Sequence, residues 1–367
     1  MMIAFSDVFA DVTKQGTKLQ TSEYLASGKY PIIDQGQDDI AGYTDREDGL
    51  FTDVPAIIFG DHTRIVKYVD MPFFLGADGV KVLKATIPDV DYRYLYYAVS
   101  AVKIPNTGYN RHFKWLKEAQ ISLPDLSTQR RIADTLDKVS EGIGLCGRMM
   151  DELDLMVKAK FGEMFGDAHN NSAFPYKNIG DLTTVTSGGT PDRENNLYWD
   201  DGNIRWVKTT ELQNCTICDT EEKITKLGLE NSSAKLVPAG SVLIAMYGQG
   251  KTRGMTAYLE NESATNQACA CILPSSKINQ KYLWKYLMLS YDKLRSMAKG
   301  GNQPNLNIGI IKNFPVLYPP IELQNQYVEF VIYIDKSILT IKGILAKMEE
   351  MKLALMQKCF KEGKHGE

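Results

Sequence analysis

Residues 132–153 read IADTLDKVSEGIGLCGRMMDEL, and residues 327–348 read YVEFVIYIDKSILTIKGILAKM. In both stretches apolar side chains recur at alternating spacings of four and three residues, and the second set follows the first at a constant offset of 195 positions. This alternation keeps one stripe of a helix facing a partner helix, as in a coiled coil. The sequence therefore predicts two long helices that pack on each other. Their predicted seam residues are Ile132, Leu136, Val139, Ile143, Cys146, Met150 and Leu153, then Tyr327, Val331, Ile334, Ile338, Ile341, Leu345 and Met348.

The two helices are predicted to begin at equivalent positions. Pro124 precedes the first helix and Pro319 precedes the second. Proline is tolerated at a helix start because its missing N–H would have no partner within the helix. Gln129 and Gln324 are also related by the offset of 195. The matched starts support a tandem duplication.

The first helix is predicted to continue to about Phe165 and the second to about Phe360. Roughly 40 helical residues make a rod on the order of 60 Å long. The first helix contains Gly142, Gly144 and Gly147. Each glycine weakens a helix by about 1 kcal/mol relative to alanine, so we expect a local irregularity there.

A longer segment with strand-like character precedes each helix. Short β-branched and aromatic runs, such as those at 56–59 and 241–246, are broken by Gly, Asn, Asp and Pro. Each segment ends in an aromatic stretch of helical character, at 92–97 and 281–287. We expect an α+β fold with two tandem-duplicated globular domains, separated by two long helices that form an antiparallel coiled coil. The four predicted parts are residues 1–122, 123–167, 168–318 and 319–367.

Composition limits the class of protein. Hydrophobic residues make up 44% of the 367 residues, enough to bury sizeable cores. The formal net charge is −3, whereas a free-standing protein that binds nucleic acid non-specifically is usually basic. No signal peptide or membrane span is expected, and the six dilute cysteines favour a reducing, cytoplasmic setting.

Several motifs carry a resemblance to a known family. Residues 123–137, with LPxLxxQxxIxxxLD, resemble the opening of the spacer helices of Type I restriction–modification specificity subunits. The stretches GNQPNLN at 301–307 and FPV at 314–316 do so too. FPY at 174–176 and SGGTP at 187–191 look like the start of a target-recognition domain of that family. The motifs occur twice in the same order, and the resemblance covers nearly the whole chain.

The resemblance implies a division of labour. Each recognition domain would read one half of a split double-stranded DNA site, and the paired helices would fix the gap between the halves. Modification subunits, two of them, would bind the helices and methylate adenine with S-adenosylmethionine. Restriction subunits would add ATP-driven translocation and Mg-dependent cleavage. The chain itself would be a non-catalytic recognition subunit without a cofactor or metal of its own.

Candidate DNA contacts in the second globular segment come from four places. Duplex readout needs amide and guanidinium groups in the grooves, with Lys, Ser, Thr and backbone N–H groups on phosphates. A glycine-rich turn, two strand ends and a glycine-flanked loop offer such groups. Without a DNA contact, the glycine-rich residues would simply turn the chain, and the glycine-flanked loop would be a solvated hairpin tip. The candidates are Ser187, Gly188, Gly189, Thr190, Lys208, Thr209, Gln249, Lys251, Thr252, Arg253, Asn266 and Gln267.

Two clusters in the first globular segment offer the same chemistry. One is the loop counterpart of residues 249–254, and the other is a basic, aromatic cluster before the first long helix. The second could instead be a surface patch that packs against that helix. The candidates are His62, Thr63, Arg64, Lys67, Asn110, Arg111 and Lys114.

Other functions remain open at this point. A binding module of another defence system could use the same duplicated scaffold, as could a purely structural coiled-coil protein. A magnesium nuclease could be drawn through Asp192 and Glu221, since carboxylates can hold Mg²⁺ and activate water. A four-thiolate zinc site would need Cys215, Cys218, Cys269 and Cys271, but the second pair has one intervening residue where two is usual. No methyltransferase motif or complete phosphate-binding loop is found.

Overall fold

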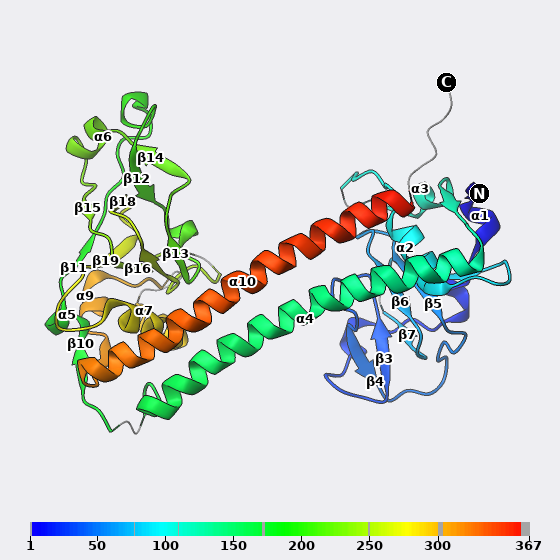
Figure 1. Cartoon of the computed structure of the whole chain (residues 1–367), viewed down its shortest axis with the longest axis horizontal. Helices are drawn as coiled ribbons and strands as arrows, with labels where there is room; N and C mark the ends of the chain where they lie inside the picture. The colour runs from blue at the N-terminus through cyan, green and yellow to red at the C-terminus, as the bar shows by residue number, and fades with distance from the viewer. Residues whose placement is uncertain are drawn as a thin grey trace. The chain divides into compact units, whose positions relative to one another are not determined.

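The computed structural model describes residues 2–76, 78–108, 110–170, 173–248, 250–299 and 304–360 (Figure 1). Its backbone contacts divide it into two compact units. Unit 1 consists of Met1–Arg148 and Ile341–Glu367, and unit 2 consists of Met149–Thr340. None of the helices in the described ranges is long and apolar enough to cross a lipid bilayer.

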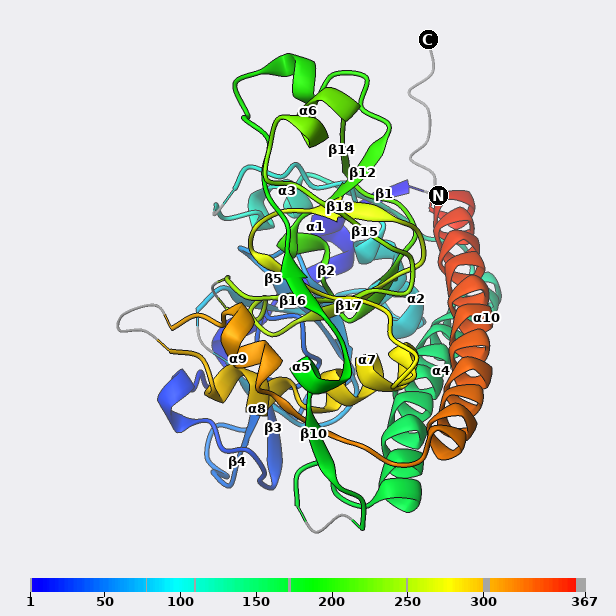
Figure 2. The ribbon, with the colours of Figure 1, turned by 90° about the vertical axis from the view of Figure 1, so that its left-hand side faces the viewer.

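Unit 2 contains two mixed sheets, whose strands face the viewer in Figure 2. The larger sheet has the order β11 (Val185–Ser187), β19 (Cys269–Ile272), β16 (Val242–Ala245), β17 (Thr256–Leu259) and β13 (Cys215–Ile217). The smaller has the order β14 (Glu222–Ile224), β12 (Ile204–Val207), β18 (Ser263–Thr265) and β15 (Leu236–Val237). Strands β12 and β18 run parallel, so both end at the same edge of their sheet.

Unit 1 repeats this topology with fewer strands. Its larger sheet has the order β2 (Phe9–Asp11), β8 (Val80–Ala85), β5 (Ala56–Gly60) and β6 (Val66–Val69). Its smaller sheet has the order β4 (Gly42–Thr44), β3 (Tyr30–Ile33) and β7 (Phe74–Leu75), with β3 and β7 parallel. Strand for strand this is the order of unit 2 without β13 and β15. The predicted duplication is confirmed.

The segments that join sheet and long helix are duplicated as well. In unit 1 they are β1 (Met2–Ala4), α1 (Phe5–Val8), α2 (Tyr92–Ser100), α3 (Phe113–Lys117) and β9 (Gln120–Ser122). In unit 2 they are β10 (Tyr176–Asn178), α5 (Ile179–Leu182), α7 (Gln280–Leu289), α8 (Tyr291–Ser296), α9 (Ile308–Lys312) and β20 (Pro315–Leu317). Strand β1 pairs antiparallel with β9, and β10 pairs in the same way with β20. The predicted aromatic helices are α2 and α7.

The two long helices are α4 (Leu126–Phe165) and α10 (Ile321–Cys359), close to the predicted limits. All fourteen seam residues named above are buried or half-buried, and none is exposed. The Asp125 carboxylate accepts hydrogen bonds from the Ser127 hydroxyl and the Thr128 N–H at the start of α4, which lowers the pKa of Asp125 to about 2. This is an N-cap, which satisfies donors that the first turn leaves unpaired.

Each unit contains part of both long helices. In unit 1 a Cβ placed on Gly142 of α4 would lie 2.1 Å from Cε of Met348 of α10. In unit 2 the rings of Phe161 and Tyr327 are 5.5 Å apart, and the Tyr327 hydroxyl donates to the Val157 carbonyl at 3.4 Å. The early part of one helix therefore packs on the late part of the other, which is the predicted antiparallel pairing.

The predicted irregularity in the first helix is wrong. Helix α4 is continuous through Gly142, Gly144 and Gly147. The Met348 side chain fills the space that a side chain at 142 would need. Packing against a neighbouring helix overrides a weak local propensity of about 1 kcal/mol per glycine.

A buried glutamine joins α4 to the aromatic helix α2 of unit 1. Gln129 is 2% exposed. Its Oε1 accepts from the Asp91 N–H at 3.1 Å, and its Nε2 donates to the Pro124 carbonyl at 2.8 Å. Asp91 in turn caps α2, since its carboxylate accepts from the N–H groups of Arg93 and Tyr94. One side chain thus ties the start of α4 to the start of α2.

Unit 2 repeats the same connection. Gln324 of α10 is fully buried. It accepts from the Asn279 N–H at 2.9 Å and donates to the Pro319 carbonyl at 2.8 Å. The Asn279 side chain caps α7 by accepting from the N–H groups of Lys281 and Tyr282. The matched glutamines seen in the sequence are therefore matched connections between a long helix and its globular part.

We expect Gln324→Leu to destabilise the protein. Leucine has a similar volume but leaves the Asn279 N–H and the Pro319 carbonyl buried without a partner, at a cost of about 1–3 kcal/mol for each group. Urea unfolding monitored by circular dichroism measures the loss. Gln326→Leu on the exposed side of the same helix is the matched control. Equal stability of the two variants would contradict this account of Gln324.

Candidate nucleic-acid interface

Four of the predicted contact residues of unit 2 lie at one edge of its smaller sheet. Because β12 and β18 run parallel, Lys208 and Asn266 leave the sheet side by side, and the Asn266 N–H donates to the Val207 carbonyl at 3.0 Å. The exposed side chain of Gln267 accepts a hydrogen bond from the Thr190 hydroxyl. The structure therefore brings Thr190, Lys208, Asn266 and Gln267 together from three separate segments.

Sequence reasoning missed an arginine in this neighbourhood. The Arg193 guanidinium stacks on the ring of Trp199 at 3.8 Å and lies 4.7 Å from the ring of Trp206. It also donates to the carboxylate of Glu222, to which Lys208 donates from the other side at 2.8 Å. Arg193 follows the glycine-rich turn by only a few residues and Trp199 is close behind it, but Trp206 and Glu222 are more distant in sequence.

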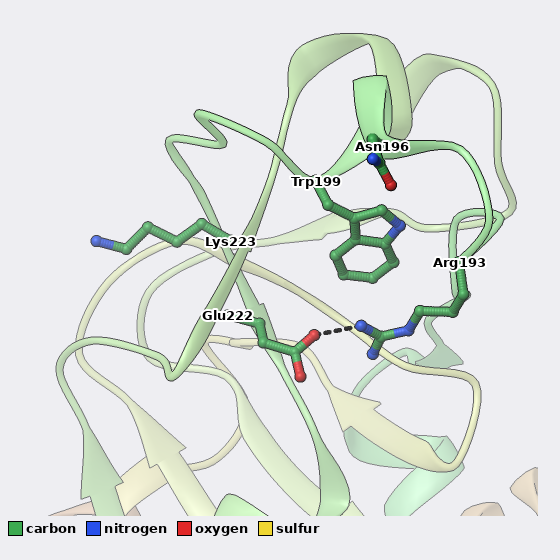
Figure 3. Close-up of a pocket in the computed structure, with 5 residues that line it drawn as sticks. All are labelled: Arg193, Asn196, Trp199, Glu222 and Lys223. Atoms are coloured by element: carbon green, nitrogen blue, oxygen red, sulfur yellow. Dashed lines mark hydrogen bonds and ion pairs between the residues drawn. The ribbon is translucent and has the colours of Figure 1, made fainter.

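These side chains border a pocket of about 320 Å³ (Figure 3). Its lining residues are Arg193, Asn196, Trp199, Glu222 and Lys223. They offer one aromatic face, two cations, one amide and one carboxylate. The arrangement suits recognition of a flat polar group through its edge.

The charges at this edge are largely paired. Burial alone would raise the pKa of Glu222, but hydrogen bonds from Lys208 and Arg193 hold it below its ordinary value. Glu221 and Glu222 both contact the Lys208 ammonium, at 2.9 and 2.8 Å, and raise the pKa of Lys208. Lys208 therefore stays charged, with its charge offset by two carboxylates. The adjacent Thr209 is half-buried.

The glycine-rich turn does not form the phosphate cradle that we considered. Gly188 and Gly189 are buried, and the Gly189 N–H donates to the Thr265 carbonyl at 2.9 Å. A Cβ on Gly188 would lie 1.9 Å from the same carbonyl oxygen. Ser187 is half-buried within β11, where it pairs with Ala270. These glycines allow two segments to approach closely, so they are withdrawn as contact residues.

The glycine-flanked loop between β16 and β17 is described except for Gln249, which lies outside the described residues. Lys251 is exposed, and its carbonyl accepts from the Tyr291 hydroxyl at 2.6 Å. Thr252 and Arg253 are half-buried. Arg253 donates to the Pro304 carbonyl, so one donor of its guanidinium already has a partner within the chain.

The two candidate clusters of unit 1 meet at Asp61. The Asp61 carbonyl accepts from the His112 N–H at 2.7 Å and lies 3.0 Å from His112 Nδ1. The Asp61 carboxylate accepts from the Phe113 N–H at 2.8 Å, at the start of α3. Both Asp61 and His112 are buried. This contact places the β5–β6 loop beside residues 110–114.

The cationic side chains of this region remain accessible. Asn110, Arg111 and Lys114 are exposed, and Arg64 is half-buried, with a donor on the Ile104 carbonyl at 3.3 Å. Lys114 lies over the ring of Trp115. Among the described residues, neither Arg64 nor Arg111 nor Lys114 forms an ion pair. Sequence reasoning missed the exposed Lys117, which lies on the same short helix.

Lys67 is not part of this surface. Its side chain is 4% exposed, lies 3.5 Å from the Asp34 carboxylate and donates to the Asp38 carbonyl. It is buried because the alternation of strand β6 turns it inward, so Lys67 is withdrawn as a contact residue. In the loop before it, His62 is half-buried and the exposed Thr63 donates to the Gln35 carbonyl at 2.7 Å. Gln35, at the end of β3, is a further polar residue that sequence reasoning missed.

The two units place their candidate residues at matching positions. Thr63 and Arg64 lie between β5 and β6, as Lys251 and Thr252 lie between the equivalent strands β16 and β17. Gln35 follows β3 as Thr209 follows the equivalent strand β12. Each unit thus gathers polar side chains at the end of a parallel strand pair and in the adjoining loop.

The metal hypotheses receive no geometric support. Within the described ranges, no three or more His, Cys, Asp or Glu side chains gather as metal ligands. Cys269 and Cys271 are buried in β19, where burial raises the pKa of both thiols, whereas Cys218 is exposed. For the nuclease alternative, Glu221 pairs with Lys208, and Asp192 accepts from the Glu194 N–H.

Comparisons with known proteins agree with the duplicated fold. A family model described as the Type I restriction modification DNA specificity domain matches residues 2–153 and 171–350. The Escherichia coli Type I restriction enzyme EcoR124I/EcoR124II specificity subunit is 25% identical over 348 residues, which are 89% of this chain and 85% of that protein. The Haemophilus influenzae HindI specificity subunit is 26% identical over 153 residues, 40% of this chain and 32% of that protein.

Two solved structures share the fold. The S subunit of a Type I restriction–modification system from M. genitalium aligns with a TM-score of 0.63 at 16% identity, over 99% of this chain and 96% of that chain. A chain from a study of complex assembly and conformational transition of the type I R-M system aligns with a TM-score of 0.59 at 17% identity, over 98% and 97%. At these identities the likeness shows the fold.

We expect Gly188→Ala to destabilise unit 2. The new methyl group would overlap the Thr265 backbone, and overpacking a tight site costs about 1–3 kcal/mol. Gly162→Ala in α4 is the control: a Cβ there meets nothing within 4 Å, and alanine favours the helix by about 1 kcal/mol. Denaturant unfolding should move in opposite directions for the two variants. A stable Gly188→Ala protein would restore the turn as a candidate phosphate site.

Proposed function

The chain belongs to the Type I restriction modification DNA specificity family, and from this premise we propose that each of its two globular domains reads one half of a split duplex DNA site. Residues 1–122 would read one half and residues 168–318 the other. The resemblance found in the sequence is thereby confirmed at the level of the family. The assignment of each domain to a half-site is the proposal.

One observation carries this division of labour. Both units have the same order of strands and the same glutamine connection to a long helix, yet they carry different side chains at matching positions. Unit 1 offers the accessible cations Arg64, Arg111 and Lys114, whereas unit 2 offers amides together with paired charges. A common scaffold with different surface chemistry suits two readers of different sequences.

The proposed contact residues are those that the structure leaves accessible. Phosphate contacts fix the register on DNA, and amide or guanidinium groups in the major groove read base edges. Sequence reasoning did not include Arg193. The proposed set is His62, Thr63, Arg64, Asn110, Arg111 and Lys114 in unit 1, and Thr190, Arg193, Lys208, Thr209, Lys251, Thr252, Arg253, Asn266 and Gln267 in unit 2.

We assign the long helices to partner binding and to the gap between half-sites. Large apolar side chains on them are exposed to solvent, and we propose that partner chains cover these side chains. These include Leu145, Leu155, Tyr333, Leu339 and Leu353, each at least half exposed. The proposed partners are two modification subunits, which would supply S-adenosylmethionine-dependent methylation, and restriction subunits, which would supply the ATP- and Mg-dependent steps. The chain itself would contribute recognition and no catalytic residue.

Mapping of adenine methylation by single-molecule sequencing, with and without this gene, tests the proposed function. We expect the loss of one split motif with a fixed gap. Exchange of residues 168–318 for the same part of another family member should then change one half of that motif and leave the other half unchanged. Changes in both halves would refute the division of labour.

Arg111→Ala and Lys114→Ala should weaken DNA binding by the complex evenly across sequences. Each removes a charge that is proposed to contact phosphate, so each should lower the steepness of the salt dependence by about one counterion. Fluorescence anisotropy over a salt series measures both effects. Lys29→Ala, which removes an exposed lysine paired with Glu47, is the control. A selective change at one base position would instead assign base reading to these side chains.

A further inference from the structure

The second globular segment holds one arginine in an unusual setting. Arg193 lies between the exposed surface and two tryptophans whose rings meet edge to face at 5.1 Å. Both rings are fixed, because Trp199 donates to the Asp192 carbonyl at 2.9 Å and Trp206 donates to the Gly189 carbonyl at 3.0 Å. Figure 3 shows the guanidinium beneath Trp199 and directed at Glu222.

Stacking leaves the edge of the guanidinium free for hydrogen bonds. A guanidinium has five N–H donors in its plane, and its face can rest on an aromatic ring. In the described residues, Arg193 donates one hydrogen bond, from Nη1 to Glu222. Its side chain is still 49% exposed. The remaining donors form a planar fork that can meet two acceptors on a flat partner.

Glu222 holds this fork in place. The carboxylate bonds Arg193 and Lys208 together, and its lowered pKa keeps it ionised at neutral pH. An arginine that is already ordered loses less side-chain entropy on binding than a free one does. The pocket is thus pre-formed in the unbound protein.

Among the described residues, the other arginines of unit 2 do not pack on two fixed aromatic rings. Arg205 pairs through Nε with Asp219 at 3.1 Å. Arg253 donates to the Pro304 carbonyl, and its buried Nε has no partner among the described atoms. Arg295 donates to the Arg253 carbonyl at 2.7 Å and to the Tyr291 hydroxyl. Only at Arg193 does a fixed, stacked fork adjoin the proposed contacts Thr190 and Lys208.

We propose that Arg193 is a specificity-determining residue that reads a guanine in the half-site assigned to residues 168–318. This inference rests on the proposed function and goes beyond it by naming a base and its reader. Guanine presents O6 and N7 as two acceptors in the major groove, and an arginine fork is their commonest protein partner. Trp199 and Glu222 act as positioning residues that orient the fork.

The test uses the full-length chain assembled with its own modification subunits. The wild-type complex first methylates a plasmid library with randomised sites, and sequencing gives the motif. Arg193→Ala is then assayed on duplexes that vary one position at a time. At one G·C pair of that half-site we expect discrimination to fall by about 5- to 150-fold, the range for a bidentate contact, with other positions unchanged.

Two further variants make the result decisive. Arg193→Lys keeps the charge beside Glu222 but lacks the fork, so it should lose discrimination at the same position even if Arg193→Ala folds poorly. Arg205→Ala, which removes from strand β12 an arginine with its own carboxylate partner, should keep the wild-type pattern.

An even loss of rate at every position, together with a lower melting temperature, would assign Arg193 a purely structural role and overturn the inference. So would a half-site without a G·C pair, or full guanine preference in both Arg193 variants. If the wild-type complex methylates no split motif, the proposed function itself fails, and that outcome is visible before any variant is tested.

Discussion

The buried glutamine at the start of each long helix is the constraint on which the rest of the structure depends. Gln129 and Gln324 each offer one acceptor and one donor in opposite directions. They satisfy the N–H of a helix-capping residue on one side and a carbonyl ahead of the long helix on the other. A leucine or a shorter amide could not bridge both groups. In both units the start of the long helix is therefore tied to the start of an aromatic helix.

This connection lets the surface vary while the scaffold stays constant. Around it, both units keep a strand pair next to the long helix, a capped aromatic helix and a parallel strand pair that ends at one edge. Loops carry functional residues readily because they can change without disturbing a rigid scaffold. In unit 2 the added strands β13 and β15 and the pocket beside Trp199 are such changes. Duplication thus gives two similar scaffolds with different surfaces.

The sequence predicted well those features that depend on the spacing of apolar and aromatic residues along the chain. The seam residues, the helix limits and the aromatic helices α2 and α7 all follow from spacing along the chain. The expected irregularity at Gly142 failed because Met348, over 200 positions away, fills the space beside it. Lys67 was wrongly predicted to lie on the surface. Its side chain is on the inward face of β6, and a charged residue in the sequence does not indicate an inward position.

The candidate surface was predictable only in part for the same reason. Lys208 and Asn266 could be proposed as strand ends, but their adjacency depends on the parallel pairing of β12 with β18. Arg193 was missed because nothing near it in sequence reveals Trp206 or Glu222 as neighbours. Contacts between distant segments decide which polar side chains form a surface, and composition cannot show them.

The distribution of charge explains how a chain with a net charge of −3 can read DNA. In unit 2 the cations next to the parallel strand ends already have carboxylate partners, as with Lys208 and Glu221, Arg205 and Asp219, and Lys223 and Asp219. Paired cations release few counterions, so they add little sequence-independent affinity. On the proposed function, such a surface would discriminate among base edges by hydrogen bonds while holding non-specific DNA weakly. Cations without a carboxylate partner, such as the exposed Arg111 and Lys114 of unit 1, would then supply the phosphate contacts that fix the register on DNA.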